Sequence, residues 1–295
     1  MRQHNQEELF KRTCDIIRPG LLQRETPLIV GAGSGGARVA EELVRSGISH
    51  IILADLPDER LLEHNIIRHP LGYRDLGRLK TEAVRDRLLD INPACQVEIH
   101  GLDFAEDREL AEHLLRKATQ CHSCVDNDKA RYAINEMIVE NHVPAFFAGV
   151  FDGGVGGEVI RVMPGGPCYA CVASMLNRSP RFEQDRDESF DYSDPDQDQY
   201  RSTAALNIDI SQIALVHARV ALNTLMEKYE LEGGSPMEGN YVLFGNRQSA
   251  PLFPSMLHCE TWQVQKADDC MVCSGLNEAD CASQADEIMA SATVR

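Results

Sequence analysis

The stretch that most constrains the fold runs from Pro27 to Asp55. It reads as a short apolar strand, a glycine-rich turn, a helix, a second apolar strand and an acid. Gly31, Gly33 and Gly36 match the G-x-G-x-x-G spacing, which lets the backbone turn tightly and approach a phosphate. The helix that follows directs its free N–H groups at that phosphate, and Asp55 can accept hydrogen bonds from a ribose. The stretch therefore predicts a nucleotide site, although it does not separate NAD from ATP.

The composition of the chain limits the kinds of partner and the cellular locations that we expect. The chain has 295 residues, of which 43% are hydrophobic, so it can bury the core of one large or two modest domains. Its formal net charge of −17 argues against nucleic acid, which needs a basic face, and suits a soluble protein with a basic protein partner. No apolar run is long enough to cross a bilayer, and residues 1–10 lack a signal-peptide core, so we expect a cytoplasmic protein.

Apolar patterns of strands and helices alternate along most of the chain. Further strands are predicted at 97–102, 121–125, 143–150, 159–163, 241–245 and 259–265. Helices are predicted at 7–17, 80–92, 106–118 and 129–141, and a long buried one from a cap at Ser202-Thr203 to about Tyr229. Because alternating strands and helices imply a parallel sheet, we expect an α/β, Rossmann-like fold. Its central sheet should be mostly parallel, with an antiparallel C-terminal extension.

Composition changes also suggest how the chain is divided. We expect an N-terminal helical arm at 1–26, one domain at 27–275 and a polar tail at 276–295. Within the domain, acidic residues crowd a segment at about 174–202 that has almost no aliphatic side chains. This loop could be a solvated linker or a lid over a binding groove. Loops this long inside a compact domain are usually functional, which favours the lid.

A polar loop follows Asp55 where an ordinary dinucleotide domain returns directly through a helix. It carries Asn65, Arg68 and Lys80 towards the carboxyl ends of the strands. Cations that converge on a glycine turn imply a polyphosphate. The alternative is a solvated basic loop.

Asp126 lies just past another strand end, where open α/β sheets bind ligands. A carboxylate at this position could hold Mg²⁺ together with phosphates. It could equally cap the helix that follows, since aspartate is a common N-cap residue. The residues alone leave both interpretations open.

Two C-x-x-C pairs, Cys168/Cys171 and Cys270/Cys273, have the spacing of metal-binding knuckles. With both pairs on turns, two such knuckles complete a tetrahedral Zn²⁺ site, which would join the start of the acidic segment to the C-terminal region. Four sulfur ligands leave no open position, so the predicted zinc is structural rather than catalytic. The alternative is one or two redox pairs. A disulfide framework is not expected in a reducing compartment.

Together these features resemble the superfamily of adenylyltransferases that activate ubiquitin-like and sulfur-carrier proteins, including the ThiF-, MoeB- and HesA-type enzymes. The resemblance extends from about Phe10 to Gly275. It rests on the glycine turn with Asp55, on Asn65-x-x-Arg68 and Lys80, on Asp126-Asn127 with Arg131 following, and on the two cysteine pairs. Each feature alone is common, but the ordered set is specific, and it argues for ATP rather than NAD.

The resemblance implies a reaction and a set of roles. The C-terminal glycine carboxylate of a small β-grasp protein would attack the α-phosphate of ATP, giving an acyl-adenylate and pyrophosphate. The residues implied are Gly31, Gly33, Gly36, Asp55, Asn65 and Asn127 for the nucleotide, Arg68 and Lys80 for the phosphates, and Asp126 for Mg²⁺. The family usually dimerises, with an N-terminal arginine reaching into the neighbouring site, and Arg12 matches that position loosely.

One departure concerns the segment after the first cysteine pair. Family members that form a thioester or persulfide often carry their cysteine there, but this chain has none between Cys171 and Cys259. We therefore expect an enzyme that adenylates and then hands over to another protein or nucleophile. Adenylation of a small molecule, peptide or tRNA and a non-catalytic scaffold role are the alternatives. The combination of Arg68, Lys80 and Asp126 favours an enzyme.

Overall fold

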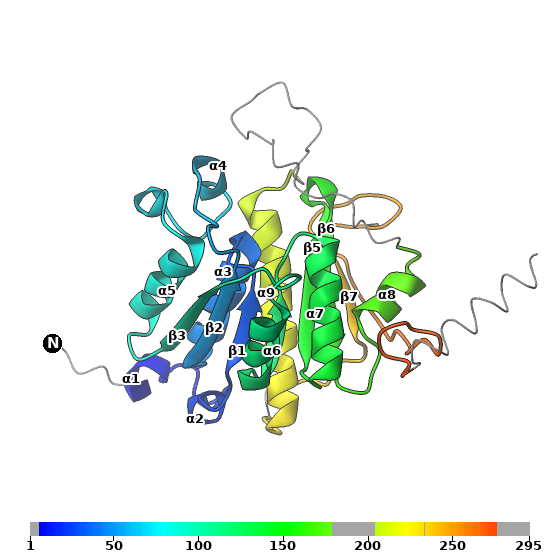
Figure 1. Cartoon of the computed structure of the whole chain (residues 1–295), viewed down its shortest axis with the longest axis horizontal. Helices are drawn as coiled ribbons and strands as arrows, with labels where there is room; N and C mark the ends of the chain where they lie inside the picture. Colours follow the sequence, from blue (N-terminus) through cyan, green and yellow to red (C-terminus); the bar gives the residue numbers. More distant parts are fainter. Residues whose placement is uncertain (1–5, 179–203, 233, 276–295) are drawn as a thin grey trace, which may run out of the picture.

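The structure, a computed structural model, describes residues 6–178, 204–232 and 234–275. Within these residues, eight strands form one sheet in the order β3-β2-β1-β4-β5-β6-β7-β8 (Figure 1). The strands are β1 (Pro27–Val30), β2 (His50–Asp55), β3 (Gln96–Gly101), β4 (Gln120–Ser123), β5 (Ala145–Val150), β6 (Gly156–Val162), β7 (Tyr241–Gly245) and β8 (Cys259–Trp262). Strands β1 to β5 pair in parallel, and β6, β7 and β8 continue the sheet antiparallel. The predicted fold class is confirmed.

Strand β1 lies at the point where the winding of the sheet reverses. It pairs with β2 on one side and with β4 on the other. Side chains of β1 and β4 are buried on both faces, as expected for central parallel strands. In open α/β sheets, ligands bind outside the carboxyl ends of the strands at such a switch point. The glycine turn after β1 and the segment after β4 both lie at this place.

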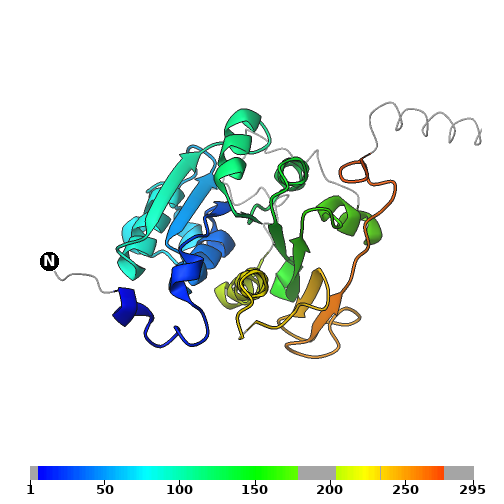
Figure 2. The same cartoon turned by 90° about the horizontal axis from the view of Figure 1, so that it is seen from below.

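Helices cover both faces of the sheet. They are α1 (Gln6–Phe10), α2 (Pro19–Leu22), α3 (Ser34–Arg45), α4 (Glu63–Ile66), α5 (Lys80–Ile91), α6 (Arg108–Lys117), α7 (Asp128–Glu140), α8 (Tyr169–Met175) and α9 (Asn207–Lys228), with 3₁₀ turns at Tyr73–Asp75 and Asp152–Gly154. Figure 2 shows α3, α5 and α9 on one face and α6, α7 and α8 on the other. Along β1, Leu28 and Val30 pack in one core and Ile29 in the other, because successive side chains of a strand point to opposite faces.

Two predicted helix boundaries are wrong. Helix α1 ends at Phe10 instead of residue 17, because the Thr13 amide and hydroxyl both donate to the Phe10 carbonyl oxygen and close a turn there. Helix α9 begins after Leu206, whose N–H donates to the Asp209 carboxylate over 3.0 Å. Ser202-Thr203, the predicted cap, lies outside the described residues and before this N-cap.

The remaining predicted segments are only partly described. The predicted acidic loop begins inside α8, which continues to Met175, and its residues 179–203 lie outside the described part of the chain, as does the tail at 276–295. In the N-terminal arm, Ile17 and Leu22 are buried in the core on the α3, α5 and α9 face. No helix in the described ranges has the length and hydrophobicity needed to span a membrane.

Candidate nucleotide site and four-cysteine cluster

The glycine turn after β1 needs its glycines for steric reasons. Gly31 has a φ of +95°, and a Cβ there would lie 2.8 Å from the Cys124 carbonyl oxygen. A Cβ on Gly36 would lie 1.9 Å from the Gly31 carbonyl oxygen, so α3 could not approach the turn with a larger residue. Gly33 is the N-cap of α3; a Cβ there would meet nothing within 4 Å, and no side chain caps the helix. At Gly33 the N-terminus of α3 is therefore neither crowded by neighbouring atoms nor capped by a side chain, as an anion site requires.

Asp55 supports this turn from the end of β2. Its Oδ2 accepts the Ala32 N–H and its Oδ1 accepts the Leu56 N–H, each over 2.9 Å. Burial raises the pKa of the Asp55 carboxyl, while these two hydrogen bonds act in the opposite direction. The carboxylate therefore fixes the backbone of the glycine turn directly. Its predicted contact with a ribose would use the remaining lone pairs and stays a prediction.

His69 is a supporting residue that the sequence did not single out. Its Nδ1 accepts the Leu71 N–H over 3.2 Å, so its Nε2 carries the proton and donates to the Ala32 carbonyl oxygen over 3.0 Å. Burial lowers the pKa of the His69 imidazole to about 4, so the ring is neutral near pH 7. Asp55 and His69 thus hold the two backbone polar groups of Ala32 from opposite elements. A histidine in a polar loop carries no sequence signal for this contact.

Lys80 is the first residue of α5 and lies beside the turn. Its Nζ donates to Glu59 Oε1 over 2.6 Å, and its side chain is only 11% exposed. Glu59 in turn donates its N–H to the Leu56 carbonyl oxygen over 3.2 Å, and the Leu56 N–H donates to Asp55 Oδ1 over 2.9 Å, which links Lys80 to the carboxylate that holds the glycine turn. The structure therefore brings Lys80 to the glycine turn. Its partner Glu59 was missed in the sequence.

Asn65 and Arg68 lie on the loop between β2 and α5. Asn65 Oδ1 accepts the Leu62 N–H over 2.9 Å, and the Asn65 carbonyl oxygen accepts the N–H groups of Arg68 and His69. Asn65 therefore shapes α4. Arg68 is half-buried and directly precedes His69, which is anchored on Ala32. The predicted phosphate contacts of Asn65 and Arg68 stay predictions.

In the segment after β4, the neighbouring residues Asp126 and Asn127 have separate roles. Asn127 Oδ1 accepts the Ala130 N–H over 2.8 Å and caps α7, so the cap is made by Asn127 and not by Asp126. Asp126 is exposed, two residues after Cys124, whose N–H donates to the Val30 carbonyl oxygen. Asp126 is thus available beside the glycine turn for the predicted Mg²⁺. Nucleotide binding by Asn127 stays a prediction, since its side chain already serves the helix.

Arg12 is not part of this arrangement within one chain. It is exposed and follows α1, whose Leu9 and Phe10 line a pocket with Arg45 and Asn92, at the C-terminal ends of α3 and α5. Figure 1 accordingly shows α1 at the bottom of the sheet and α4 at the top. Arg12 therefore lies at the opposite edge from the glycine turn. A role in the site of a second chain stays a prediction.

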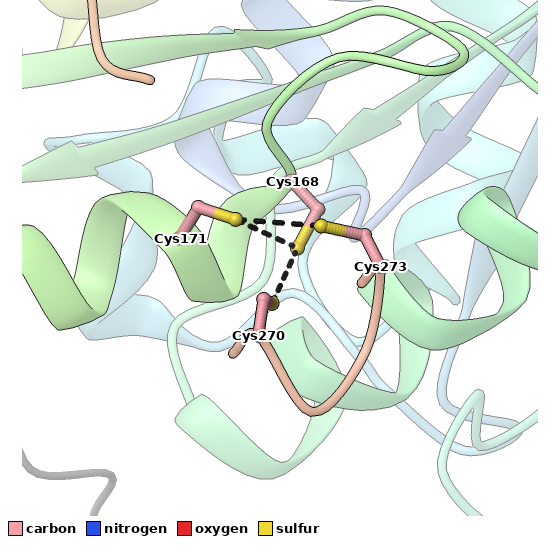
Figure 3. Close-up of side chains that lie close together, drawn as sticks. All are labelled: Cys168, Cys171, Cys270 and Cys273. Carbon is pink, nitrogen blue, oxygen red and sulfur yellow. Dashed lines mark hydrogen bonds between the residues drawn. The ribbon is translucent and has the colours of Figure 1, made fainter. Parts of the chain in front are cut away.

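The four cysteines of the two C-x-x-C pairs come together in one buried cluster (Figure 3). Their Sγ atoms lie 3.9 Å apart for Cys168 and Cys171, 3.6 Å for Cys168 and Cys270, and 3.4 Å for Cys171 and Cys273. Tetrahedral ligation with Zn–S bonds of about 2.3 Å separates the sulfurs by about 3.8 Å, so the cluster fits a zinc ion. The first pair, however, starts α8 instead of lying on a turn, because Cys168 is the N-cap and Cys171 is helical.

Two N–H donors surround the sulfurs. Asn135, which is fully buried on α7, donates from Nδ2 to Cys168 Sγ over 3.5 Å, and Ala267 donates its N–H to Cys171 Sγ over 3.5 Å. The Asn135 Oδ1 also accepts the Tyr169 N–H, which fixes the amide. Donors of this kind stabilise thiolate ligands around a metal. The sequence shows no signal for Asn135, because two strands, β5 and β6, separate it from the first cysteine pair.

A doubly wound sheet with a glycine turn at its switch point defines a nucleotide-binding α/β class. A model of the ThiF family matches residues 20–261, and the chain belongs to this family. The ubiquitin-like modifier-activating enzyme 5 of Caenorhabditis elegans is 30% identical over 183 residues, which cover 57% of this chain and 43% of the relative. That of Drosophila ananassae is 33% identical over 159 residues, covering 50% and 40%. The matches thus span less than half of these relatives.

Solved structures with the same fold include Escherichia coli MccB. Its complex with ATP has a TM-score of 0.63 at 18% identity, covering 86% of this chain and 68% of MccB. The complex of the microcin C7 biosynthetic enzyme MccB with N-formylated MccA has a TM-score of 0.65 at 18% identity, with 86% and 69% covered. At this identity the likeness is one of fold.

Proposed function

We propose that this protein is an ATP-dependent adenylyltransferase that activates the C-terminal carboxylate of a ubiquitin-like or sulfur-carrier-like protein ending in glycine. The observation that carries the proposal is the glycine turn itself. Asp55 and His69 hold Ala32 from two sides, and Lys80 is joined to Asp55 through Glu59 and Leu56, at the switch point of a ThiF-family sheet. A rigid turn with a cation beside it suits a triphosphate.

The chemistry follows from charge. An oxygen of the substrate carboxylate attacks the α-phosphorus of ATP, the bond to the bridging oxygen breaks, and pyrophosphate leaves with its electron pair. Because both reactants are anions, the step needs positive charge placed in advance. Lys80 and Arg68 would supply it, with Asn65 orienting the phosphates. Asp126 would hold Mg²⁺, which neutralises phosphate charge when bound.

The partner class is favoured by the relatives, which are named as ubiquitin-like modifier-activating enzymes. A smaller carboxylate substrate is the second candidate, because one structure with the same fold is MccB in complex with N-formylated MccA. Since no cysteine lies between Cys171 and Cys259, we propose that the acyl-adenylate passes to another protein or nucleophile. A cytoplasmic homodimer, with zinc held by the four cysteines, completes the proposal.

Pyrophosphate exchange tests this function. Purified protein with ATP, Mg²⁺ and a candidate partner ending in glycine should exchange labelled pyrophosphate into ATP, and the same partner without its last glycine should not support exchange. Lys80→Ala should abolish exchange while the thermal melt stays cooperative. Exchange that is absent with every partner and small carboxylate would instead favour a non-catalytic scaffold.

A further inference from the structure

The Lys80 ammonium has an anionic partner within the chain. Glu59 Oε1 accepts from Lys80 Nζ over 2.6 Å, with the two side chains 34% and 11% exposed. A second contact joins the same residues, because the Lys80 N–H donates to the Glu59 carbonyl oxygen over 2.9 Å. The pair is therefore held by both backbone and side chain, unlike a typical surface ion pair.

A short antiparallel ladder fixes the register of this pair. Arg60 and Leu79 form an antiparallel bridge next to it. Beyond them, the Leu61 N–H donates to the Arg78 carbonyl oxygen over 3.0 Å, and the Gly77 N–H donates to the Leu61 carbonyl oxygen over 2.8 Å. The loop leaving β2 is thus pinned to the residues that start α5. Glu59 stands opposite Lys80 because the backbone places it there.

The pair is connected to the glycine turn through Asp55. The Glu59 N–H donates to the Leu56 carbonyl oxygen over 3.2 Å, and the Leu56 N–H donates to Asp55 Oδ1 over 2.9 Å, so hydrogen bonds join the pair to Asp55. Asp55 in turn accepts the Ala32 N–H of the turn. A phosphate bound at the first turn of α3 would therefore compete with the Glu59 carboxylate for the same ammonium.

We propose that Glu59 is a positioning residue that holds Lys80 beside the glycine turn and occupies the place of a phosphate until ATP arrives. A buried ammonium is costly without an anion, so Glu59 keeps Lys80 in place. A ligand that separates this pair must replace the Glu59 carboxylate as the partner of Lys80, and only a ligand with enough phosphate charge can do so. Glu59 therefore lowers the affinity for ATP and leaves that for the bare nucleoside, which does not compete for Lys80, unchanged. This inference rests on the proposed nucleotide site.

The test measures nucleotide affinity by displacement of a fluorescent ATP analogue in the presence of Mg²⁺, using the full chain. Glu59→Gln keeps an oxygen that accepts from Lys80 but removes the competing charge, so ATP should bind about three- to tenfold more tightly. The affinity for adenosine, which has no phosphate, should not change. A merely structural role for Glu59 would alter both ligands alike.

Two further variants isolate the pair. In a Lys80→Ala background, Glu59→Gln should leave ATP affinity unchanged, because the ammonium it competes for is absent. Glu63→Gln, which removes an exposed carboxylate from α4 in the same loop, controls for the general loss of negative charge and should have little effect. Glu59→Asp, which keeps the charge but shortens the side chain, should give a smaller gain than Glu59→Gln.

The outcomes separate this inference from the proposed function. If the wild-type protein binds no ATP, the nucleotide site itself fails. If it binds ATP and Lys80→Ala weakens binding, but Glu59→Gln matches Glu63→Gln or weakens ATP, the role of Glu59 is overturned. The role is also overturned if Glu59→Gln has the same effect with and without Lys80. A thermal melt of each variant confirms that folded proteins are compared.

Discussion

Asp126 and Asn127, two neighbouring polar residues after β4, have different roles, and their residue types alone do not distinguish these roles. Aspartate and asparagine are equally good N-cap residues, so the sequence leaves the cap of α7 undecided. The structure assigns it to Asn127, whose side chain accepts the Ala130 N–H, and leaves Asp126 exposed beside the glycine turn. Substitution of Asn127 should therefore affect stability, whereas substitution of Asp126 should affect catalysis.

We predict that alanine substitutions at Asn127 and Asp126 affect different properties of the protein. Asn127→Ala removes the cap and should lower the free energy of unfolding by about 1 kcal/mol in urea titrations. Asp126→Ala should change stability by less than about 0.5 kcal/mol, since the side chain is exposed, yet abolish pyrophosphate exchange. Exchange that persists with its normal Mg²⁺ dependence in Asp126→Ala would contradict the role of Asp126.

His69 should make stability depend on mild acid. Burial lowers the pKa of its imidazole to about 4, whereas the unfolded chain should titrate near 6.5. Below pH 6.5 the unfolded state binds more protons, so stability falls as pH falls towards 4. At pH 5.5 this costs about 1.4 kcal/mol relative to pH 7.5. His69→Gln can still donate to Ala32 without titrating, and its urea midpoint should fall correspondingly less between these pH values. Equal falls in both proteins would refute this.

At the scale of elements, the sequence predicts helices and strands with periodic apolar residues. It does not predict contacts between residues that lie far apart along the chain. Strands β1, β2 and β7 and helices α3, α5 and α7 were predictable because their apolar residues recur at regular spacing. The start of α9 was not, because Leu206 gives no capping signal of its own. His69 and Asn135 were missed because their partners lie 37 and 33 residues away in sequence. The glycine turn itself was predictable because its spacing is local.

The cysteine cluster joins α8 to the C-terminal segment, so its metal should stabilise both. Metal analysis should find about one zinc per chain. Cys270→Ser should lose the zinc and lower the free energy of unfolding by about 3 kcal/mol or more, because binding energy at a structural site is folding energy. The matched control is Cys259→Ser, which changes an exposed cysteine outside the cluster. Full stability after complete chelation of zinc would contradict a structural ion.

For the molecule as a whole, the two predicted arginines occupy opposite edges of the sheet. Arg68 belongs to the loop over the glycine turn, whereas Arg12 follows α1 near the C-terminal ends of α3 and α5 (Figure 1). One chain therefore cannot bring Arg12 to its own nucleotide site without unpacking Phe10 and Ile17 from the core. If Arg12 takes part in adenylation, it does so in a second chain, and the site is complete only in a dimer.

Complementation between inactive variants tests this arrangement. Arg12→Ala and Lys80→Ala should each abolish exchange as homodimers. In a mixed dimer, the chain with Arg12→Ala keeps its own Lys80 and receives Arg12 from its neighbour, so one of the two sites works. Co-expression of the variants with random pairing should therefore restore about a quarter of wild-type exchange, since half of the dimers are mixed and half of their sites are complete. If Arg12 served its own chain, every site in every dimer would lack one residue and the mixture would stay inactive. An Arg12→Ala homodimer with full activity would instead remove Arg12 from the reaction.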